Sequence, residues 1–239
     1  MKHALVTGGA SPIGAAISRR LAADGHHVIV HANANAQGAQ ALVAEIAASG
    51  GSAESLTLDL TDAPNALASL EAKATDHPIQ IVVHNAGLHR DMPFAGMDLD
   101  DWTSVLDVNL SGLFVALRPL IMPMMRARWG RVIAVSSLTA VSGNRGQTNY
   151  AAAKGGYLAF AKSLTREYAS RGITANVVAP GLIATPDTEA MENFEALRKL
   201  CPAGRAGSPD DVAGIIGFLA SDQSGYISGQ MIAVDGGTS

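Results

Sequence analysis

The feature that most constrains the fold is a regular alternation of short β-rich runs with longer helical patterns, which continues almost to the end of the chain. The runs are apolar at successive positions, so they fit strands that are buried on both faces. Strands of this kind, each followed by a crossover helix, form a parallel sheet covered on both sides. The sequence therefore predicts a doubly wound α/β fold with about seven strands, at residues 4–6, 28–31, 55–58, 80–84, 131–136, 174–178 and 231–234.

The chain shows no sign of division into separate domains. Its 239 residues, 48% of them hydrophobic, are enough to bury one large core. No internal repeat, low-complexity tract or linker rich in proline and glycine interrupts them. We therefore expect a single domain over residues 1–239. Residues 184–205 form a polar segment that contains Met191 and Phe194, and we interpret this segment as a substrate lid.

Composition argues against several classes of function. The formal net charge is -4 and the basic residues are scattered, so a nucleic-acid partner is not expected. No window approaches the ~20 apolar residues of a membrane span, and the apolar run near residue 1 is too short for a signal peptide, so we expect a cytoplasmic protein without membrane contact. With Cys201 as the only cysteine and no metal-ligand spacing among the seven histidines, we expect neither a disulfide nor a catalytic metal.

Two long helical patterns, at residues 99–127 and 150–170, carry more alanine, leucine and methionine than one buried helix face requires. A second apolar face is typical of a helix that another subunit covers. The sequence therefore predicts an oligomer.

The stretch TGGASPIG at residues 7–14 follows the first strand and begins the first helix. Glycines at such a turn let the backbone approach a pyrophosphate, while the helix supplies free N–H groups and a partial positive charge. Gly8, Gly9 and Gly14 meet that requirement. A plain glycine-rich turn is the alternative.

Pro12 lies inside this turn, where its fixed φ suits the start of a helix but its ring removes one N–H donor. Ile13 and Gly14 are still expected to donate to phosphate. Ser11 is expected to cap the helix or to contact phosphate through its hydroxyl. We therefore expect the turn to bind phosphate in an altered form.

Polar side chains lie at three strand ends, at Thr7, His84 and Ser136. Ligands of doubly wound sheets bind at the carboxyl ends of the strands, where the strand order reverses. We therefore expect the three loops to face one crevice.

Tyr150 and Lys154 are four residues apart in a helical pattern, hence on one face of the helix. An ammonium beside a phenol favours the phenolate and lowers the phenol pKa from about 10 toward neutrality, which makes a usable acid or base. Ser137 is placed to hold a substrate oxygen. The alternative for the pair is a helix face exposed to solvent.

A series of motifs stands in order along the chain: residues 7–14, Asp59-Leu60, Asn85-Ala86-Gly87, Asn109, Ser137, residues 150–154 and Pro180-Gly181. Their order and spacing resemble the signature of the short-chain dehydrogenase/reductase family, whose domain is a Rossmann fold. The resemblance covers essentially the whole chain. Within the family, residues 163–188 and 225–237 most resemble β-ketoacyl-acyl-carrier-protein reductases.

The resemblance implies a role for each matching residue. Tyr150 would protonate a carbonyl oxygen as hydride arrives, and Lys154 would bind the nicotinamide ribose and lower the phenol pKa. Ser137 would orient the carbonyl, and Asn109 would hold a water in a proton relay; a buried amide bonded to backbone is the alternative for Asn109. The residues implied for cofactor binding are Gly8, Ser11, Ile13, Gly14, Asn33, Asp59, Leu60, Asn85, Ala86, Gly87, Tyr150, Lys154, Pro180, Gly181, Ile183 and Thr185.

Within that set, the resemblance places Asn85, Ala86 and Gly87 on the adenosine side, Asp59 and Leu60 at the adenine, and the residues from Pro180 to Thr185 around the nicotinamide. For Asp59 a helix N-cap is the alternative. Three positions depart from the family pattern: Pro12 replaces a glycine, Ser11 replaces an arginine common in NADP-using acyl reductases, and His84 replaces an asparagine. We expect a structural role for His84.

NADPH is the expected cofactor. An NAD-binding domain places a carboxylate after its second strand to accept from the ribose 2′-hydroxyl, and residues 26–44 contain none. His31, Asn33 and Asn35 are expected to donate to a 2′-phosphate. Amides bind phosphate less strongly than an arginine does, so NAD remains the alternative.

The expected substrate is a β-ketoacyl thioester on acyl carrier protein, with Arg128 and Arg171 matching positions that dock this acidic partner in the carrier-protein reductases. Ordinary solvated helix ends are the alternative for both arginines. An acyl channel is expected from Leu138, Val141, Leu182, Met191 and Phe194. The other readings are a reductase or dehydrogenase of a free alcohol, sugar or cyclic ketone, and an inactive nucleotide-binding subunit. The resemblance also suggests a homotetramer, with a dimer as the second choice.

Overall fold

The structure, a computed structural model, describes the main chain of residues 1–239 and the side chains of residues 1–75 and 77–239. Its centre is a seven-stranded sheet in the order β3-β2-β1-β4-β5-β6-β7, and every neighbouring pair is parallel. All seven predicted strands are present. They are β1 (His3–Thr7), β2 (His27–Ala32), β3 (Ser52–Thr57), β4 (Ile79–His84), β5 (Gly130–Val135), β6 (Ile173–Pro180) and β7 (Met231–Val234).

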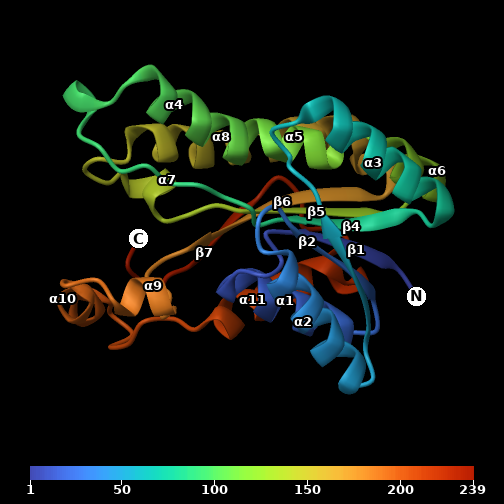
Figure 1. The fold of residues 1–239 in the computed structure, drawn as a ribbon, viewed down its shortest axis with the longest axis horizontal. Coiled ribbons are helices and arrows are strands. Elements are labelled where there is room, and N and C mark those ends of the chain that lie inside the picture. Colours follow the sequence, from blue (N-terminus) through green and yellow to red (C-terminus); the bar gives the residue numbers. More distant parts are fainter.

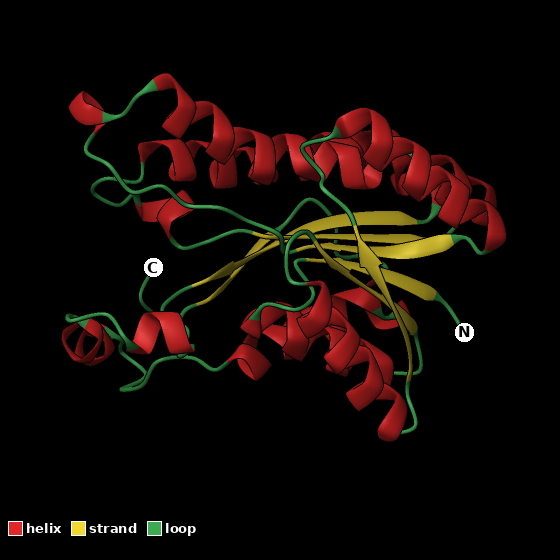
Figure 2. Ribbon diagram, in the orientation of Figure 1, coloured by secondary structure: helices red, strands yellow, loops and turns green.

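Helices cover both faces of the sheet, which gives the three layers seen in Figures 1 and 2. One layer contains α1 (Pro12–Ala23), α2 (Ala36–Ala48) and α11 (Pro209–Ala220). The other contains α3 (Ala63–Asp76), α4 (Leu99–Leu106), α5 (Gly112–Leu117), α6 (Ile121–Ala127) and α8 (Thr148–Tyr168). The short helices α7 (Thr139–Ser142), α9 (Pro186–Glu189) and α10 (Phe194–Leu200) lie at the end of the molecule opposite the N-terminus (Figure 1). The fold is therefore the predicted doubly wound α/β fold.

Strand β1 shows how the sequence divides the core between the two layers. Ala4 and Val6 pack with the α1 side, whereas Leu5 packs with the α8 side. Successive side chains of a strand point to opposite faces, so a strand covered on both faces must be apolar at every position. Every residue of β5 and β6 is likewise buried, although Arg131, Thr174 and Asn176 are polar exceptions to this rule.

The predicted helix over residues 99–127 is not continuous. A π-helical segment (Asp107–Ser111) lies between α4 and α5, and Pro119 lies in the turn before α6. Proline has no N–H to donate and its ring clashes with the preceding turn, so the chain bends there by 41°. Among the described residues no single helix is long and apolar enough to cross a membrane. Only the two helical stretches on either side of this bend, residues 99–117 and 121–127, have the required length and composition when they are taken together.

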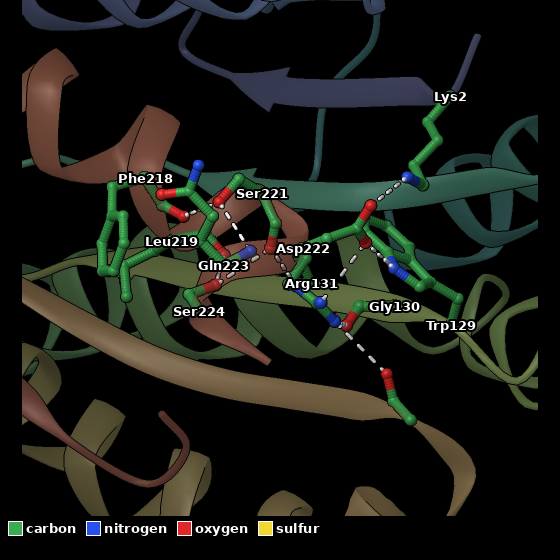
Figure 3. A network of polar contacts seen from close by, with 11 residues as sticks. Lys2, Trp129, Gly130, Arg131, Phe218, Leu219, Ser221, Asp222, Gln223 and Ser224 are labelled. Carbon is green, nitrogen blue, oxygen red and sulfur yellow. Dashed lines mark hydrogen bonds and ion pairs between the residues drawn. The ribbon is translucent and has the colours of Figure 1, made fainter. Parts of the chain in front are cut away.

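A polar cluster ties the amino-terminal edge of the sheet together (Figure 3). The buried Arg131 side chain donates to the carbonyls of Ser221 (3.0 Å), Gly130 (2.9 Å) and Gly172 (3.3 Å). Its guanidinium carbon lies 4.3 Å from the centre of the Trp129 ring. Arg131 thus connects the starts of β5 and β6 to the segment after α11.

We expect Arg131→Met to lower the free energy of unfolding by roughly 3 kcal/mol, because the three carbonyls lose their charged donor in a buried site. Urea unfolding followed by circular dichroism measures the loss. The exposed Arg126 on α6 supplies the control, and Arg126→Met should change the stability by less than about 0.5 kcal/mol. Equal stabilities of the two variants would contradict this role.

Candidate active site

The main crevice opens at the carboxyl ends of the strands, on both sides of β1, where the strand order reverses. Thr7 and His84 are register partners at the ends of β1 and β4. The cavity has a volume of about 650 Å³. Its lining consists of Gly8, Ser11, Pro12, Ile13, His31, Asn33, Asn85, Ala86, Gly87, Leu88, His89, Val108, Val135, Ser136, Ser137, Tyr150, Lys154, Pro180, Gly181, Ile183, Thr185 and Thr188. The three predicted loops do meet there.

The glycine turn is held by Ser11, which is the N-cap of α1. Its hydroxyl oxygen accepts from the Gly14 N–H (3.2 Å), and Pro12 takes the first helical position. Gly14 therefore does not offer the free donor that the sequence predicted, because Ser11 uses it. Among the described hydrogen bonds, the Ile13 N–H in the first turn of α1 donates to no acceptor.

Two glycines of the turn are needed because there is no room for a side chain. A Cβ on Gly14 would meet the Gly8 carbonyl oxygen, and a Cβ on Gly8, where φ is +61°, would lie 2.9 Å from Ala86 Cα. The Asn85 amide crosses the same gap and donates to Gly8 O (3.0 Å) and Ser11 Oγ (3.1 Å). The turn and the end of β4 thus form one rigid floor.

The predicted catalytic side chains lie across the crevice from this floor. Helix α8 begins at Thr148, so Tyr150 and Lys154 lie one turn apart near its start, and both line the cavity with Ser137. Lys154 Nζ donates to Val135 O (2.9 Å) and to the Tyr157 hydroxyl (3.3 Å). It lies 5.6 Å from the centre of the Tyr150 ring. The pair therefore faces the crevice and is not a solvated helix surface.

The predicted lowering of the Tyr150 pKa is wrong for this structure. Burial raises the pKa of Tyr150 above its ordinary value, although a hydrogen bond with Ser137 opposes the rise. Burial also lowers the pKa of Lys154 to about 7. The sequence argument counted the attraction between ammonium and phenolate but not the cost of removing both groups from water. Tyr150 is therefore protonated at neutral pH, the form that can donate a proton.

Asn109 is fully buried in the π-helical segment. Its amide nitrogen donates to Leu88 O and Val105 O, both at 2.8 Å, as the alternative of a buried amide predicted. Its Oδ1 has no partner among the described residues. A Cβ on Gly87 would lie 2.9 Å from this oxygen and 3.3 Å from Lys154 Nζ, so both polar atoms border the space that the missing side chain leaves.

Comparisons with known proteins agree with this geometry. Residues 8–239 match a family model described as enoyl-(acyl carrier protein) reductase. The chain is 42% identical over 239 residues to the 3-oxoacyl-[acyl-carrier-protein] reductase FabG of Escherichia coli, covering 99% of this chain and 96% of the relative. It is 41% identical over 236 residues to a 3-oxoacyl-[acyl-carrier-protein] reductase of Synechocystis sp., covering 98% and 95%. The chain belongs to the short-chain dehydrogenase/reductase family.

This structure is also similar to the solved structure of another protein. The solved structure is described as an NAD(P)-dependent gluconate 5-dehydrogenase of Beutenbergia cavernae with NADP bound, and it superposes with a TM-score of 0.95 at 35% identity, covering 99% of this chain and 96% of the other. The short-chain dehydrogenase/reductase fold is therefore shared over the full length. The names of these proteins differ in substrate.

The crevice fits a nicotinamide dinucleotide, the cofactor type of this family. Glycines at the turn allow close approach of a pyrophosphate, and the Ile13 N–H at the start of α1 is placed to donate to it. Thirteen of the sixteen residues predicted to bind cofactor line the cavity. Gly14 lies beneath the turn, Asp59 accepts from Thr61 N–H (2.9 Å) and Leu60 is buried in the core. Adenine contacts by Asp59 and Leu60 therefore stay a prediction.

Of the three residues predicted to donate to a 2′-phosphate, Asn33 lines the cavity, and its side chain also hydrogen-bonds to the Asp59 carboxylate. His31 is buried and uses both ring nitrogens, since Nδ1 accepts from Gly8 N–H (3.3 Å) and Nε2 donates to Leu58 O (2.9 Å). The Asn35 side chain caps α2 by accepting from Gly38 N–H (3.0 Å) and does not line the cavity. The expectation for His31 and Asn35 is thus not supported, whereas Asn33 lines the cavity.

The residues predicted for substrate and partner lie farther out. Leu138, Val141, Leu182, Met191 and Phe194 are outside the cavity lining, and Val141 (55%) and Met191 (44%) are exposed. The segment that contains α9 and α10 contributes Thr185 and Thr188 to the crevice wall. A lid that closes over substrate therefore stays a prediction.

Arg128 and Arg171 do not lie at the crevice mouth. Arg128 ends α6 just before β5, and Arg171 precedes β6, so both are at the amino ends of strands whose carboxyl ends form the crevice. Arg128 Nη2 donates to Ser170 O (3.1 Å), which joins the two loops. The predicted strands at residues 131–136 and 174–178 already placed both arginines just before parallel strands, so the sequence itself indicated the edge opposite the crevice.

Sequence reasoning missed several lining residues, notably Leu88, His89, Val108 and Thr188. The His89 ring stands edge-on to Tyr150, with ring centres 6.5 Å apart. Leu88 and His89 directly follow the Asn85-Ala86-Gly87 motif at a strand end, which is the one signal that pointed to them. Val108 and Thr188 carry no pattern of their own.

Proposed function

We propose that the chain is an NADPH-dependent reductase that converts a 3-oxoacyl thioester carried by acyl carrier protein into the 3-hydroxyacyl thioester. The observation that carries the proposal is the meeting of Ser137, a protonated Tyr150 and Lys154 in one crevice that also holds the glycine turn. Relatives named 3-oxoacyl-[acyl-carrier-protein] reductase, 40–42% identical over nearly the whole chain, support the substrate class.

Each side chain has a separate task in this reaction. The bound dinucleotide supplies the hydride. Ser137 holds the carbonyl oxygen beside the Tyr150 hydroxyl, and Tyr150 gives that oxygen its proton. Lys154, fixed on Val135 O, carries the positive charge nearest to the phenolate that remains. Asn109 Oδ1, beside Gly87, is the free acceptor for a water that returns a proton to Lys154.

Three reactions are separated by one set of initial rates. Rates of NADPH and NADH oxidation are measured with acetoacetyl thioester, with crotonyl thioester and with 5-ketogluconate. The proposal expects acetoacetyl thioester with NADPH to be fastest. A faster crotonyl rate would favour the enoyl reduction in the family model's description, and a faster 5-ketogluconate rate would favour the free ketone of the solved neighbour. Either result would refute the proposed substrate.

Asn33 is expected to determine cofactor choice. Asn33→Asp places a carboxylate at the end of β2, where it repels a 2′-phosphate and accepts from a 2′-hydroxyl. We expect the Kd for NADPH to rise about tenfold or more and the Kd for NADH to fall. Fluorescence titration measures both. Asn35→Asp is the matched control, because residue 35 caps α2 outside the cavity and Asp caps equally well. An unchanged ratio in Asn33→Asp would contradict the assignment.

Docking of the carrier protein at Arg128 and Arg171 stays part of the proposal, but no longer at the mouth of the same subunit's crevice. Because both lie at the edge opposite the crevice, a carrier docked on them delivers its acyl chain to another subunit. This requires the predicted homotetramer, or the dimer, and the exposed Phe114 (51%) and Met122 (46%) on the α4–α6 layer support such a contact.

Reversing both charges in Arg128→Glu/Arg171→Glu is expected to raise KM about tenfold for a carrier-bound substrate and to leave KM for a small thioester unchanged. Arg126→Glu, a reversal at another exposed site on α6, serves as the control. Equal increases for both substrates would exclude docking at this pair.

A further inference from the structure

A buried row of polar groups connects Lys154 to the strand end beneath the glycine turn. Lys154 Nζ donates to the Tyr157 hydroxyl (3.3 Å), which donates to the main-chain oxygen of Asn109 (3.0 Å). The same oxygen lies 2.9 Å from His84 Nε2, and His84 Nδ1 lies 3.0 Å from Thr7 Oγ1. Tyr157, His84 and Thr7 are all 0% exposed. None of these contacts was predicted from the sequence, in which Tyr157 belongs to no motif.

The hydrogen bonds at Thr7 determine which His84 nitrogen carries the proton. Thr7 Oγ1 accepts from the N–H groups of Asn85 (3.1 Å) and Ala86 (3.0 Å), so its own proton points to His84 Nδ1. Nε2 must then carry the ring proton and donate it to Asn109 O. Burial, with the nearby Lys154 charge, lowers the pKa of His84 to about 3, so the ring stays neutral at neutral pH.

The Asn109 carbonyl does not require these side-chain donors. Its oxygen already accepts from the Gly112 N–H within the helix. Satisfying a buried carbonyl therefore does not explain why Tyr157 and His84 both converge on it. The bond from Tyr157 to Asn109 O orients the Tyr157 hydroxyl: its proton is used on that oxygen, so its lone pairs face Lys154 Nζ, while the His84 bond holds the same carbonyl from β4.

We propose that Tyr157 is a positioning residue for Lys154, whose ammonium it holds on the crevice floor through a hydroxyl oriented by the Asn109 carbonyl and His84. The role rests on the proposed function of Lys154 in carbonyl reduction. Lys154 Nζ then has two acceptors, Val135 O and Tyr157 Oη, and a hydrogen bond to the charged form of a group favours that form. Tyr157 thus favours the charged form of Lys154 against the burial that disfavours it.

The test follows the titration of Lys154 itself. The chain has five lysines, so a protein labelled with ¹³C at the lysine ε-carbons gives few signals, and Lys154→Met assigns the one of interest. In Tyr157→Phe, which removes only the hydroxyl, we expect the Lys154 pKa to fall by about one unit because the ammonium loses an acceptor. The other four lysines should titrate as in the parent.

The control uses the same substitution elsewhere on α8. Tyr168→Phe lies more than three turns from Lys154 and should leave its titration unchanged. The titratable side chains that face Lys154 are Tyr150 and Tyr157 from α8 and His84 from β4, and only one of them is altered in Tyr157→Phe. A folded Tyr157→Phe with an unchanged Lys154 pKa overturns the proposal.

A measurement on the parent protein covers the case in which Tyr157→Phe does not fold. The ¹⁵N shifts of the His84 ring should show the Nε2–H form throughout about pH 5 to 8. An Nδ1–H or doubly protonated ring in that range would remove the row of hydrogen bonds and the proposal with it. Neither measurement needs substrate or cofactor. A parent enzyme that fails to reduce 3-oxoacyl thioesters therefore counts against the proposed function alone.

Discussion

Tyr150→Phe is expected to lower kcat for 3-oxoacyl thioester reduction about 10³-fold, because the substitution removes the hydroxyl that hydrogen-bonds with Ser137 and leaves the ring in position. The Kd for NADPH should change little, since the phenyl ring still fills the crevice wall. Stopped-flow or steady-state rates of NADPH oxidation give the first quantity, and fluorescence titration gives the second.

The matched control is Tyr226→Phe, at a fully exposed tyrosine (104%) far from any described cavity lining. It should keep the parent kcat. If Tyr150→Phe binds NADPH and turns over as fast as the parent, then Tyr150 is not the acid and the mechanism above fails. Loss of both binding and turnover would instead show that the ring has a structural task.

Lys154→Met is expected to have two opposite effects. Activity should fall about 10²-fold, because the charge that stabilises the phenolate is removed. Stability at pH 7 should rise, because the fold no longer buries an ammonium. A lysine whose pKa is lowered to about 7 in the folded protein binds fewer protons than in the unfolded chain between pH 7 and its ordinary pKa near 10.4, so folding is penalised most at and below pH 7.

The sign of this effect gives a sharp measurement. Between pH 7 and 10 the folded lysine is neutral while the unfolded lysine still holds its proton, so the parent becomes more stable as pH rises and the penalty disappears near the ordinary pKa. The stability advantage of Lys154→Met should therefore shrink by about 1.4 kcal/mol per pH unit over that window. Urea unfolding of both proteins at four pH values measures it. An advantage that does not depend on pH would show that Lys154 is not a buried, titrating group.

The sequence was sufficient to predict the strands and the sheet class, because burial on both faces imposes a pattern that is readable one residue at a time. Ala4, Leu5 and Val6 must all be apolar whatever the details of packing. The helix at residues 99–127 was predicted less well. A composition suited to a helix does not distinguish the π-helical segment around Asn109 from an ordinary α-helical turn.

The candidate site divides in the same way. Motif spacing correctly predicted that Ser137, Tyr150 and Lys154 lie in one crevice. Residues four apart on a helix lie on the same face, and the carboxyl ends of parallel strands lie at the same edge of the sheet. The sequence also predicted Ser11 as a possible cap of the helix, which the structure confirms, but it did not reveal that both nitrogens of His31 are engaged. Hydrogen bonds between residues 23 or more positions apart have no local signature.

The sequence by itself therefore determined the layered α/β fold, the glycine turn and the identity of the catalytic groups, because these follow from burial and helical period. Only the tertiary structure decided the protonation of Tyr150 and Lys154 and the hydrogen bonds that engage both nitrogens of His31. It also brought together Tyr157, Asn109 and His84, which no motif connects. A pKa depends on how much water and which partners surround a group, and those are set only when the whole chain has folded.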